Sequence, residues 1–413
     1  MIQEKLVCTT CACLCDDIEV EIEENRISKI RNACRKGSSL IYASQSDKRH
    51  ASYLIYGQKV SQDEAVEKTS RLLNQAESPL LFGFDNSTLE AQSTAIELAE
   101  ALGATIDDTS SFRQGELVQT ILSNLNPTCS LDEAKDADLV IYWGSNPYHS
   151  HPRHLSHLSY YTHPKYEEAG WFPESRLISI EVRDTETTEI CDKSFRFFRI
   201  LPGEDPDFIA SVLAIIEGKK GREDAGEFLK SIKSSSFCVI YAGPGLDYSL
   251  DGEYQTFNRM VNRLGECTRI AVIPMIDPYN MRGFNQLLFD KTGFVNRVNF
   301  ANGASHGLEF SFLEQVRNNV PDCILIAGSD PLSSLPDSLV KNLGDITIIT
   351  LDPFLTATTR ISDVVLGIAV SGLETGGNAI RMDGTEISLN RVISTSIPGD
   401  EEIIRRLLDM VKR

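Results

Sequence analysis

The sequence lacks an excess of positive charge. Its 413 residues carry 40 Lys and Arg against 59 Asp and Glu, a formal net charge of −19 at pH 7. Most of the surface therefore repels phosphate groups, which excludes nucleic acid and anionic membranes as main partners. The composition, 41% hydrophobic and 24% charged, is otherwise that of an ordinary globular protein.

Long hydrophobic runs are also missing. The longest, such as residues 364–370, are far shorter than the roughly 20 apolar residues that cross a bilayer. Residues 1–6 show neither the basic region nor the apolar stretch of a secretory leader. We therefore expect a cytoplasmic protein without membrane insertion, whose ten cysteines are thiols or metal ligands and not disulfides.

Half of the cysteines form an array near the N-terminus. Cys8-x2-Cys11-x3-Cys15 is followed by Cys34, which opens a Cys-Arg-Lys-Gly segment. Four thiolates from one tight loop and one distant turn are typical of a [4Fe–4S] cluster. A structural zinc site usually shows two C-x-x-C knuckles, and only one is present, so zinc is the alternative. Cys13 is extra to this pattern and is either a bystander or an alternative ligand.

Alternating patterns predict the secondary structure of the first hundred residues. Residues 17–31 alternate polar and apolar side chains, which predicts a hairpin. Ser61-x-x-Glu64 is a capping box that opens a helix. A second helix over 89–102 ends at Gly103, a residue type favoured just past a helix terminus.

Six later apolar runs have the length and composition of buried strands: 138–143, 177–182, 236–242, 269–275, 322–327 and 346–351. Most of them are separated by helical patterns at 206–217, 253–264 and 309–318. Buried β-rich runs divided by helices are typical of doubly wound parallel sheets. The runs are too many for one sheet, so the predicted fold class is α/β, with a small N-terminal Fe–S cluster domain followed by two doubly wound α/β domains.

The predicted domain limits follow from these patterns. Residues 1–57 form the four-cysteine domain, and residues 58–135 begin the first α/β domain, which is completed by about 310–392. Residues 136–309 form the second α/β domain, and 393–413 a C-terminal helix.

Glycine and polar residues follow several predicted strands, where ligands bind in open α/β sheets. The candidate cofactor-binding residues are Gly144, Asn146, Glu181, Arg183, Gly203, Asp205, Asp330, Asp352 and Thr359. A glycine lets the backbone approach a phosphate or a ring, and acidic and hydroxyl groups suit a ribose or guanine edge. Each segment alone is a weak signal, because Gly-Ser-x-Pro and Asp-Pro are also common in turns.

Five histidines crowd one stretch: His149, His151, His154, His157 and His163. His151-x-x-His154 could place two imidazoles on one helix face as metal ligands. The spacing matches no standard zinc signature, however, and Pro147 and Pro152 break the helix that such a motif needs. We therefore favour a surface turn and helix start, in which these side chains cap, meet solvent or line a pocket.

Taken together, several segments resemble the B subunit of formylmethanofuran dehydrogenase, a molybdopterin oxidoreductase. They are CTTCACLCDDI at 8–18, NACRKG at 32–37, YWGSNPYHSHPRH at 142–154, GFNQ at 283–286 and RMDG at 381–384. The resemblance runs from residue 8 to about 392. It implies a cluster domain on two α/β domains that hold a molybdopterin guanine dinucleotide cofactor, with Cys8, Cys11, Cys15 and Cys34 as cluster ligands and Lys36 placed between cluster and pterin. In active members, molybdenum or tungsten reduces carbon dioxide to formate, which a partner subunit condenses with methanofuran.

The sequence departs from the active members at three positions that the resemblance identifies. Arg113 stands where those members have the cysteine or selenocysteine that ligates the metal, and Gln114 replaces the following histidine. A guanidinium has no free lone pair, so it cannot ligate a metal. Ile276 stands where the family usually has a substrate-binding arginine, and it cannot pair with a carboxylate.

These departures are similar to those of the family's bacterial relatives, the formyltransferase/hydrolase complexes, in which the A subunit releases formate, the D subunit moves the formyl group and the B subunit is chiefly structural. The chain is therefore expected to be such a B subunit, a partner of A, C and D subunits without catalytic residues of its own. One alternative is an active oxidoreductase that interconverts formylmethanofuran and carbon dioxide. Another is a zinc- or cluster-bearing nucleotide-binding module outside the family.

Overall fold

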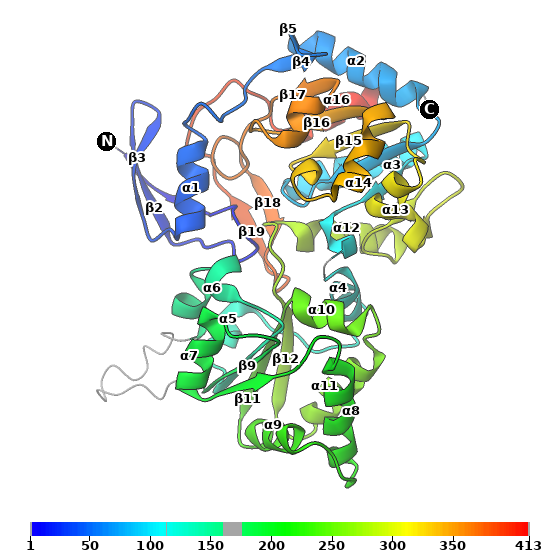
Figure 1. The fold of residues 1–413 in the computed structure, drawn as a ribbon. Coiled ribbons are helices and arrows are strands. Elements are labelled where there is room, and N and C mark those ends of the chain that lie inside the picture. The colour runs from blue at the N-terminus through cyan, green and yellow to red at the C-terminus, as the bar shows by residue number, and fades with distance from the viewer. Residues whose placement is uncertain (1, 113, 160–175, 412–413) are drawn as a thin grey trace. The chain divides into compact units, whose positions relative to one another are not determined.

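The structure, a computed structural model, describes residues 2–112, 114–159 and 176–411. The chain forms two compact units. Unit 1 comprises Met1–Phe112, Pro278–Arg381 and Glu386–Arg413, and unit 2 comprises Arg113–Asp277 and Met382–Thr385. In Figure 1 unit 1 therefore contains both the blue and the yellow-to-red segments, while unit 2 is mainly green. The units change over after Phe112 and Asp277, whereas the sequence places domain limits after residues 135 and 309.

The N-terminal part of unit 1 is a three-stranded antiparallel sheet of β1 (Ile2–Leu6), β2 (Ile18–Glu23) and β3 (Arg26–Arg31). This sheet confirms the hairpin expected over 17–31. Helix α1 (Arg35–Ala43) follows, and its Ile41 packs in one core with Ile18, Val20 and Ile27. The loop between β1 and β2 contains the first four cysteines of the array.

The main sheet of unit 1 has nine strands in the order β14-β13-β7-β6-β15-β16-β17-β4-β5. Their bounds are β4 (Tyr53–Ile55), β5 (Gln58–Val60), β6 (Pro79–Gly83), β7 (Thr105–Asp107), β13 (Val298–Asn299), β14 (Ser305–His306), β15 (Cys323–Ala327), β16 (Thr347–Leu351) and β17 (Val364–Leu366). Strands β7, β6, β15, β16 and β17 are parallel, and short antiparallel strands extend both ends of the sheet. A separate hairpin pairs β18 (Gly377–Ile380) with β19 (Glu386–Leu389).

Helices cover both faces of the main sheet of unit 1: α2 (Gln62–Gln75), α3 (Leu89–Leu102), α12 (Met281–Thr292), α13 (Phe312–Arg317), α14 (Asp337–Val340), α15 (Ala357–Ile361) and α16 (Asp400–Met410). Adjacent strand residues face opposite sides, so Leu81 packs in the core with Phe284, while Phe82 packs with Phe312. Two sequence predictions are confirmed here. Ser61 and Glu64 form the capping box of α2, and α3 ends before Gly103 at φ +63°.

Unit 2 contains a five-stranded, fully parallel sheet in the order β10-β9-β8-β11-β12. The strands are β8 (Leu139–Trp143), β9 (Arg176–Glu181), β10 (Arg196–Arg199), β11 (Phe237–Ala242) and β12 (Arg269–Pro274). The helices are α4 (Gly115–Leu122), α5 (Leu131–Ala134), α6 (Pro147–Ser150), α7 (Glu186–Ser194), α8 (Asp205–Ile216), α9 (Glu223–Lys233), α10 (Pro244–Leu250) and α11 (Gln255–Gly265). The chain builds outward from β8 in one direction and then from β11 in the other, so the order reverses between these strands. Ligands bind at such switch points in open α/β sheets.

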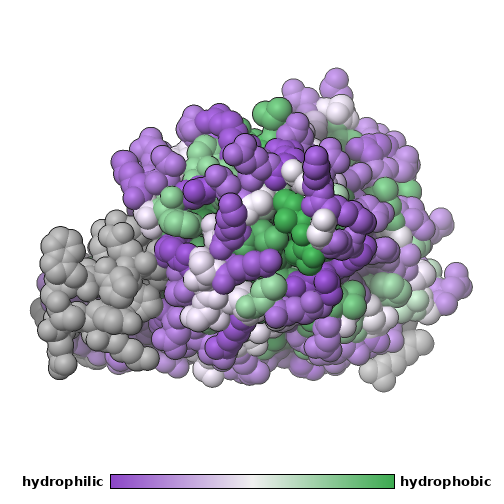
Figure 2. Space-filling view, turned by 90° about the horizontal axis from the view of Figure 1, so that it is seen from below, coloured by the Kyte–Doolittle hydropathy of each residue, from purple (hydrophilic) through white to green (hydrophobic). Residues whose placement is uncertain are grey.

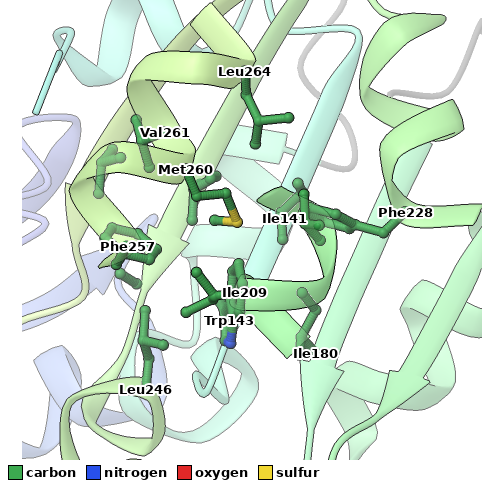
Figure 3. Close-up of a cluster of buried hydrophobic side chains, with 14 of the residues drawn as sticks. Ile141, Trp143, Ile180, Ile209, Phe228, Leu246, Phe257, Met260, Val261 and Leu264 are labelled. Atoms are coloured by element: carbon green, nitrogen blue, oxygen red, sulfur yellow. The ribbon is translucent and has the colours of Figure 1, made fainter. Parts of the chain in front are cut away.

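Trp143, the last residue of β8, is fully buried in the core of unit 2 (Figure 3). Its indole meets the rings of Phe208, Phe228 and Phe257 edge-on, with centroids 5.8–5.9 Å apart. This geometry is favourable for aromatic pairs, and it fixes the carboxyl end of β8 against the helices on one face of the sheet.

The predicted α/β class is therefore correct, and one of the two large sheets is fully parallel. The other is mixed, because short strands pair antiparallel at its edges. Within the described part of the chain, every helix is too short or too polar to cross a bilayer. Hydrophilic side chains cover most of the coloured face drawn in Figure 2; hydrophobic ones form a small central area and are otherwise scattered.

Candidate cofactor and metal site

Two backbone hydrogen bonds shape the cysteine loop of unit 1. Cys8 N–H donates to the carbonyl of Cys15 at 2.9 Å, and Leu14 N–H donates to the carbonyl of Cys11 at 3.1 Å. Leu14 adopts a left-handed conformation at φ +42°, and its side chain is buried in a small core with Val7 and Tyr279. The buried side chain of Leu14 anchors the loop, so packing holds the cysteines of the loop in place.

The distant cysteine joins the loop through the first turn of α1. Cys34 caps this helix, and its Sγ accepts a hydrogen bond from Gly37 N–H at 3.4 Å. A Cβ atom on Gly37 would lie 2.9 Å from Cys8 Sγ and 3.9 Å from Cys34 Sγ. The two thiols therefore converge on a place that only glycine leaves open. Lys36, which precedes this glycine, is half-buried in the same turn.

Burial and neighbouring thiols disfavour the thiolate forms of the array in the metal-free protein. Burial raises the pKa of Cys8 to about 11, and the neighbouring Cys11 and Cys34 act in the same direction. A hydrogen bond to Cys11 and burial together hold the pKa of Cys13 well above its usual value. Thiolates are needed to bind a metal, and a metal supplies the positive charge that stabilises them. The soft, four-sulfur donor set thus fits an iron–sulfur cluster or zinc.

A cavity of about 290 Å³ in unit 1 borders the cysteine loop. The loop contributes Thr9 and Thr10 to its wall, and the segments after β15 and β16 contribute Asp330 and Asp352. Tyr279 and Asp400 also line it. The sequence analysis singled out neither these two residues nor the threonines; the position of the threonines between Cys8 and Cys11 is the one signal that could have drawn attention to them.

Asp330 and Asp352 differ in their surroundings. Although partial burial acts to raise the pKa of Asp330, hydrogen bonds from Ser333 and Thr358 lower it overall. Burial raises the pKa of Asp352 to about 7, and its Oδ1 accepts a hydrogen bond from Phe354 N–H at 2.7 Å. Thr359, predicted as a third binding residue here, instead exchanges hydrogen bonds with Thr356 at the start of α15.

In unit 2, the end of β8 is closely packed. Gly144 has φ +58°, and a Cβ atom there would lie 2.2 Å from the backbone nitrogen of Leu246. The absence of a side chain at Gly144 therefore lets the backbone at the start of α10 pack closely against it. Asn146 Oδ1 accepts a hydrogen bond from the hydroxyl of Thr187 in α7 at 2.6 Å. Both residues hold neighbouring elements together at this switch point.

Several other predicted residues of unit 2 gather at the end of β9 and the start of α8. The pKa of Glu181 is raised overall, mainly by burial. The nearby Asp205 also raises this pKa, whereas Arg183 lowers it. Asp205 is buried, and it accepts a hydrogen bond from the indole nitrogen of Trp143 at 2.6 Å. Gly203 is exposed, and a Cβ atom added there would meet no other atom within 4 Å. The structure thus brings Glu181, Arg183 and Asp205 into one polar group.

Two of the three positions at which the sequence departs from the active members of the family, Gln114 and Ile276, lie beside the ends of β11 and β12. Gln114 is buried, and its amide nitrogen donates to the carbonyl of Met275 at 2.8 Å. Ile276 is fully buried, and its carbonyl lies 2.8 Å from Nε2 of His151. Arg113 lies outside the described residues. Side chains that are neutral or apolar and already packed therefore occupy both described positions.

The histidine segment is less exposed than the sequence suggests. His149 is exposed and pairs with Glu186 at 2.9 Å, as a surface turn predicts. The expected surface position is wrong for His151 and His154, which are buried. Burial holds the pKa of His154 well below its usual range, and its Nδ1 lies 3.0 Å from the hydroxyl of Tyr142. His163 lies outside the described residues.

Comparison with known proteins gives close relatives over the whole chain, although no family model matches. The chain is 31% identical over 430 residues to the B subunit of tungsten-containing formylmethanofuran dehydrogenase 2 from Methanocaldococcus jannaschii, covering 98% of each chain. It is 30% identical to the protein of the same name from Methanococcus maripaludis, with 99% of this chain and 98% of the relative covered.

Two solved structures share the fold. A chain of the formyltransferase/hydrolase complex from Methylorubrum extorquens, solved with methylofuran, aligns with a TM-score of 0.68 and 21% identity, over 87% of this chain and 98% of that one. Acetylene hydratase from Pelobacter acetylenicus aligns with a TM-score of 0.70 and 14% identity, over 99% of this chain and 69% of that one. At such identities the likeness concerns the fold alone. The near full-length match to the two archaeal proteins decides the family: this chain belongs to the B-subunit family of formylmethanofuran dehydrogenase.

Proposed function

We propose that the chain is the B subunit of a formylmethanofuran dehydrogenase-type complex, and that it acts there as a non-redox, structural subunit of a formyltransferase/hydrolase assembly that releases formate. One observation carries this proposal. The two described positions that the family resemblance assigns to the redox site, Gln114 and Ile276, are buried, uncharged and already packed.

Neither position can serve the chemistry of the active members. The amide of Gln114 donates to the Met275 carbonyl, so it cannot take or give a proton as a histidine would. Ile276 offers no positive charge to a carboxylate such as formate, and placing a charge there would bury it without a partner. Arg113 adds a sequence argument, because a guanidinium cannot ligate molybdenum or tungsten.

The proposal also assigns partners and cofactors. We place the chain with A, C and D subunits, since it aligns over 98% of a chain from the Methylorubrum extorquens complex, and we assign the complex to the cytoplasm. Cys8, Cys11, Cys15 and Cys34 would hold a [4Fe–4S] cluster, because the first three share one loop and the thiols of Cys8 and Cys34 converge on Gly37. A bound cluster would supply one-electron transfer or simply cross-link the loop and α1. Zinc in the same array is the competing assignment.

Strand-end residues of both units have side chains that could bind a pterin cofactor. The residues suited to a pterin guanine dinucleotide are Lys36, Asp330 and Asp352 in unit 1 and Glu181, Arg183 and Asp205 in unit 2. The cavity beside Thr9 and Thr10 could accept one end of such a molecule, about the size of a nucleoside. Strand-end carboxylates can accept hydrogen bonds from a guanine edge.

Elemental and pterin analysis of the purified native complex tests this function. We expect about four iron atoms per B subunit, with molybdenum and tungsten far below one atom per chain. Electron paramagnetic resonance of the reduced complex should show an iron–sulfur signal, and formate release should continue without an electron acceptor. Stoichiometric molybdenum or tungsten bound to this chain would overturn the structural role.

An active oxidoreductase is the second candidate. The complete cysteine array favours it, as do the relatives named tungsten-containing at 31% and 30% identity. In that case, oxidation of the formyl substrate should require a redox dye as electron acceptor and should be lost when molybdenum or tungsten is removed. Extractable pterin together with dye-dependent oxidation of the formyl substrate would establish this candidate; their absence would leave the structural role.

A further inference from the structure

Tyr279 lies in the wall of the unit 1 cavity, and its ring and its hydroxyl have different surroundings. The residue is 3% exposed, and its ring packs in one core with Val7, Leu14 and Ala379. The cysteine loop and the β18–β19 hairpin therefore both contact the ring. The buried hydroxyl, in contrast, has no hydrogen-bond partner in the described ranges of the chain, although the residue lines the cavity.

The backbone next to Tyr279 is fixed by hydrogen bonds. Asn280 donates its N–H to the carbonyl of Asp85 at 3.0 Å and its side-chain amide to the carbonyl of Ser87 at 2.7 Å. Its Oδ1 accepts a hydrogen bond from Ile380 N–H at 2.8 Å. These bonds, together with the packing of the ring, limit the rearrangements by which the hydroxyl could find a partner within the protein.

A buried hydroxyl without a partner costs free energy, and such groups are rare in folded proteins. A molecule in the cavity can supply the missing partner. Three aspartates line the cavity, Asp330, Asp352 and Asp400, whereas none of the described lining residues is Lys, Arg or His. This wall disfavours a phosphate group, and it offers acceptors to the N–H groups of a neutral ring.

We propose that Tyr279 is a ligand-binding residue of this cavity, whose hydroxyl forms a hydrogen bond with a neutral aminopyrimidinone ring. Such a ring carries both N–H groups for the aspartates and acceptor atoms for the hydroxyl. It is common to guanine and pterin, so either end of a pterin guanine dinucleotide satisfies the proposal. The inference rests on the part of the proposed function in which the cavity accepts one end of that molecule.

Two substitutions of tyrosine by phenylalanine separate a ligand-binding hydroxyl from a structural one. Tyr279→Phe removes the hydroxyl and keeps the packed ring. Tyr254→Phe is the matched control, because Tyr254 is also 3% exposed but donates its hydroxyl to Asp247 Oδ1 at 2.6 Å within unit 2. The wild-type full-length chain and both variants are produced in a host that makes no molybdopterin. Thermal unfolding midpoints are recorded, and calorimetry measures the binding of guanosine, of pterin and, as a control ring, of adenosine.

We expect Tyr279→Phe to raise the unfolding midpoint of the ligand-free chain, because the variant no longer buries an unpaired hydroxyl. Tyr254→Phe should lower the midpoint, because Asp247 loses its donor. The wild type and Tyr254→Phe should bind guanosine or pterin equally well. Tyr279→Phe should bind the same ring about tenfold more weakly, as expected for the loss of one hydrogen bond.

An unchanged or lower midpoint in Tyr279→Phe would overturn the inference, because the hydroxyl would then be bonded within the protein, for example to Ser371 in the same wall. Equal affinity of the wild type and Tyr279→Phe would also overturn it. A wild type that binds neither guanosine nor pterin, or binds adenosine as tightly, would exclude the proposed ring. These outcomes leave the structural role of the subunit untouched, whereas molybdenum or tungsten in the native complex would overturn that role and not the assignment of Tyr279.

Discussion

The strand ends of the two units are built differently. In unit 1 the segments after β15 and β16 border a cavity of about 290 Å³ into which polar groups such as Asp330 and Asp352 face. In unit 2 the corresponding space is filled by the protein itself. The chain at Leu246 packs against Gly144, and Gln114 is bonded to the carbonyl of Met275. Unit 1 therefore has a cavity at its strand ends, whereas side chains and backbone fill the corresponding space in unit 2.

The two strand ends place different demands on the chain. The core around Trp143 consists of apolar side chains and one buried acceptor, Asp205, for the indole nitrogen. A redox site needs particular donor atoms, and a few substitutions remove them. In unit 2 the side chain of Gln114 donates to a buried backbone carbonyl, so this acceptor is satisfied within the protein.

The strongest test of the closed site in unit 2 places a charge there. We expect Ile276→Arg to lower the free energy of unfolding by about 3–5 kcal/mol, because it buries a cation without a partner. Ile276→Leu, which conserves volume, should cost less than about 1.5 kcal/mol. Denaturant unfolding measures both. A change below about 1 kcal/mol for the arginine variant would mean that this position is open or finds a counter-charge.

The next test uses the carboxylate of Asp352 in unit 1. Its pKa is about 7 in the folded protein against a usual 3.8, so the folded state binds the proton more tightly than the unfolded state. The residue therefore destabilises the fold progressively as pH rises from about 4 to about 7. We expect Asp352→Asn to raise the free energy of unfolding by up to about 4 kcal/mol at pH 8 and by little at pH 4.

Asp330→Asn is the control for this pH dependence, because hydrogen bonds lower the pKa of Asp330 overall. That carboxylate stabilises the fold above its unfolded pKa, and the stabilisation is lost as pH falls through the folded value. Its replacement should therefore cost stability at neutral pH. Equal stability of Asp352→Asn and wild type at pH 8 would contradict the burial of Asp352.

A smaller effect is expected from removing the hydrogen bond of Gln114. Gln114→Ala leaves the Met275 carbonyl buried without this partner, which should cost about 1–3 kcal/mol. Gln255→Ala, at an exposed position on α11 of the same unit, should change stability by less than about 0.5 kcal/mol. Equal costs for the two variants would show that the Gln114 contact adds nothing to unit 2.

The smallest change in stability should come from Gly37→Ala, with a separate effect on the metal. Alanine is the better helix former, which offsets the shift forced on Cys8, so the free energy of unfolding of the metal-free protein should change by less than about 1 kcal/mol. The new Cβ, 2.9 Å from Cys8 Sγ, should displace this thiol and lower bound iron several-fold. Gly344→Ala, where no atom lies within 4 Å of the new Cβ, should leave iron unchanged. Full iron in Gly37→Ala would show that Cys8 is not held by this glycine.

The sequence predicted regular elements well where the pattern is local. The helix over 89–102 and the strand over 322–327 match α3 and β15 within a residue, because hydrophobic periodicity and capping residues lie within each segment. It was less informative about polar strand-end residues. Thr359 accepts a hydrogen bond from Thr356 N–H, and Gly144 packs against the backbone of Leu246. A short polar motif has the same sequence whether its partner is a ligand or another part of the chain.

The sequence by itself determined the alternation of strands and helices, the five-cysteine array and the resemblance to one family, since each depends on residue type and spacing along the chain. Only the tertiary structure decided that Tyr279 and Asp400 border the cavity, and that Gln114 and Ile276 are buried. Burial and hydrogen-bond partners depend on residues distant in sequence, which packing alone brings together.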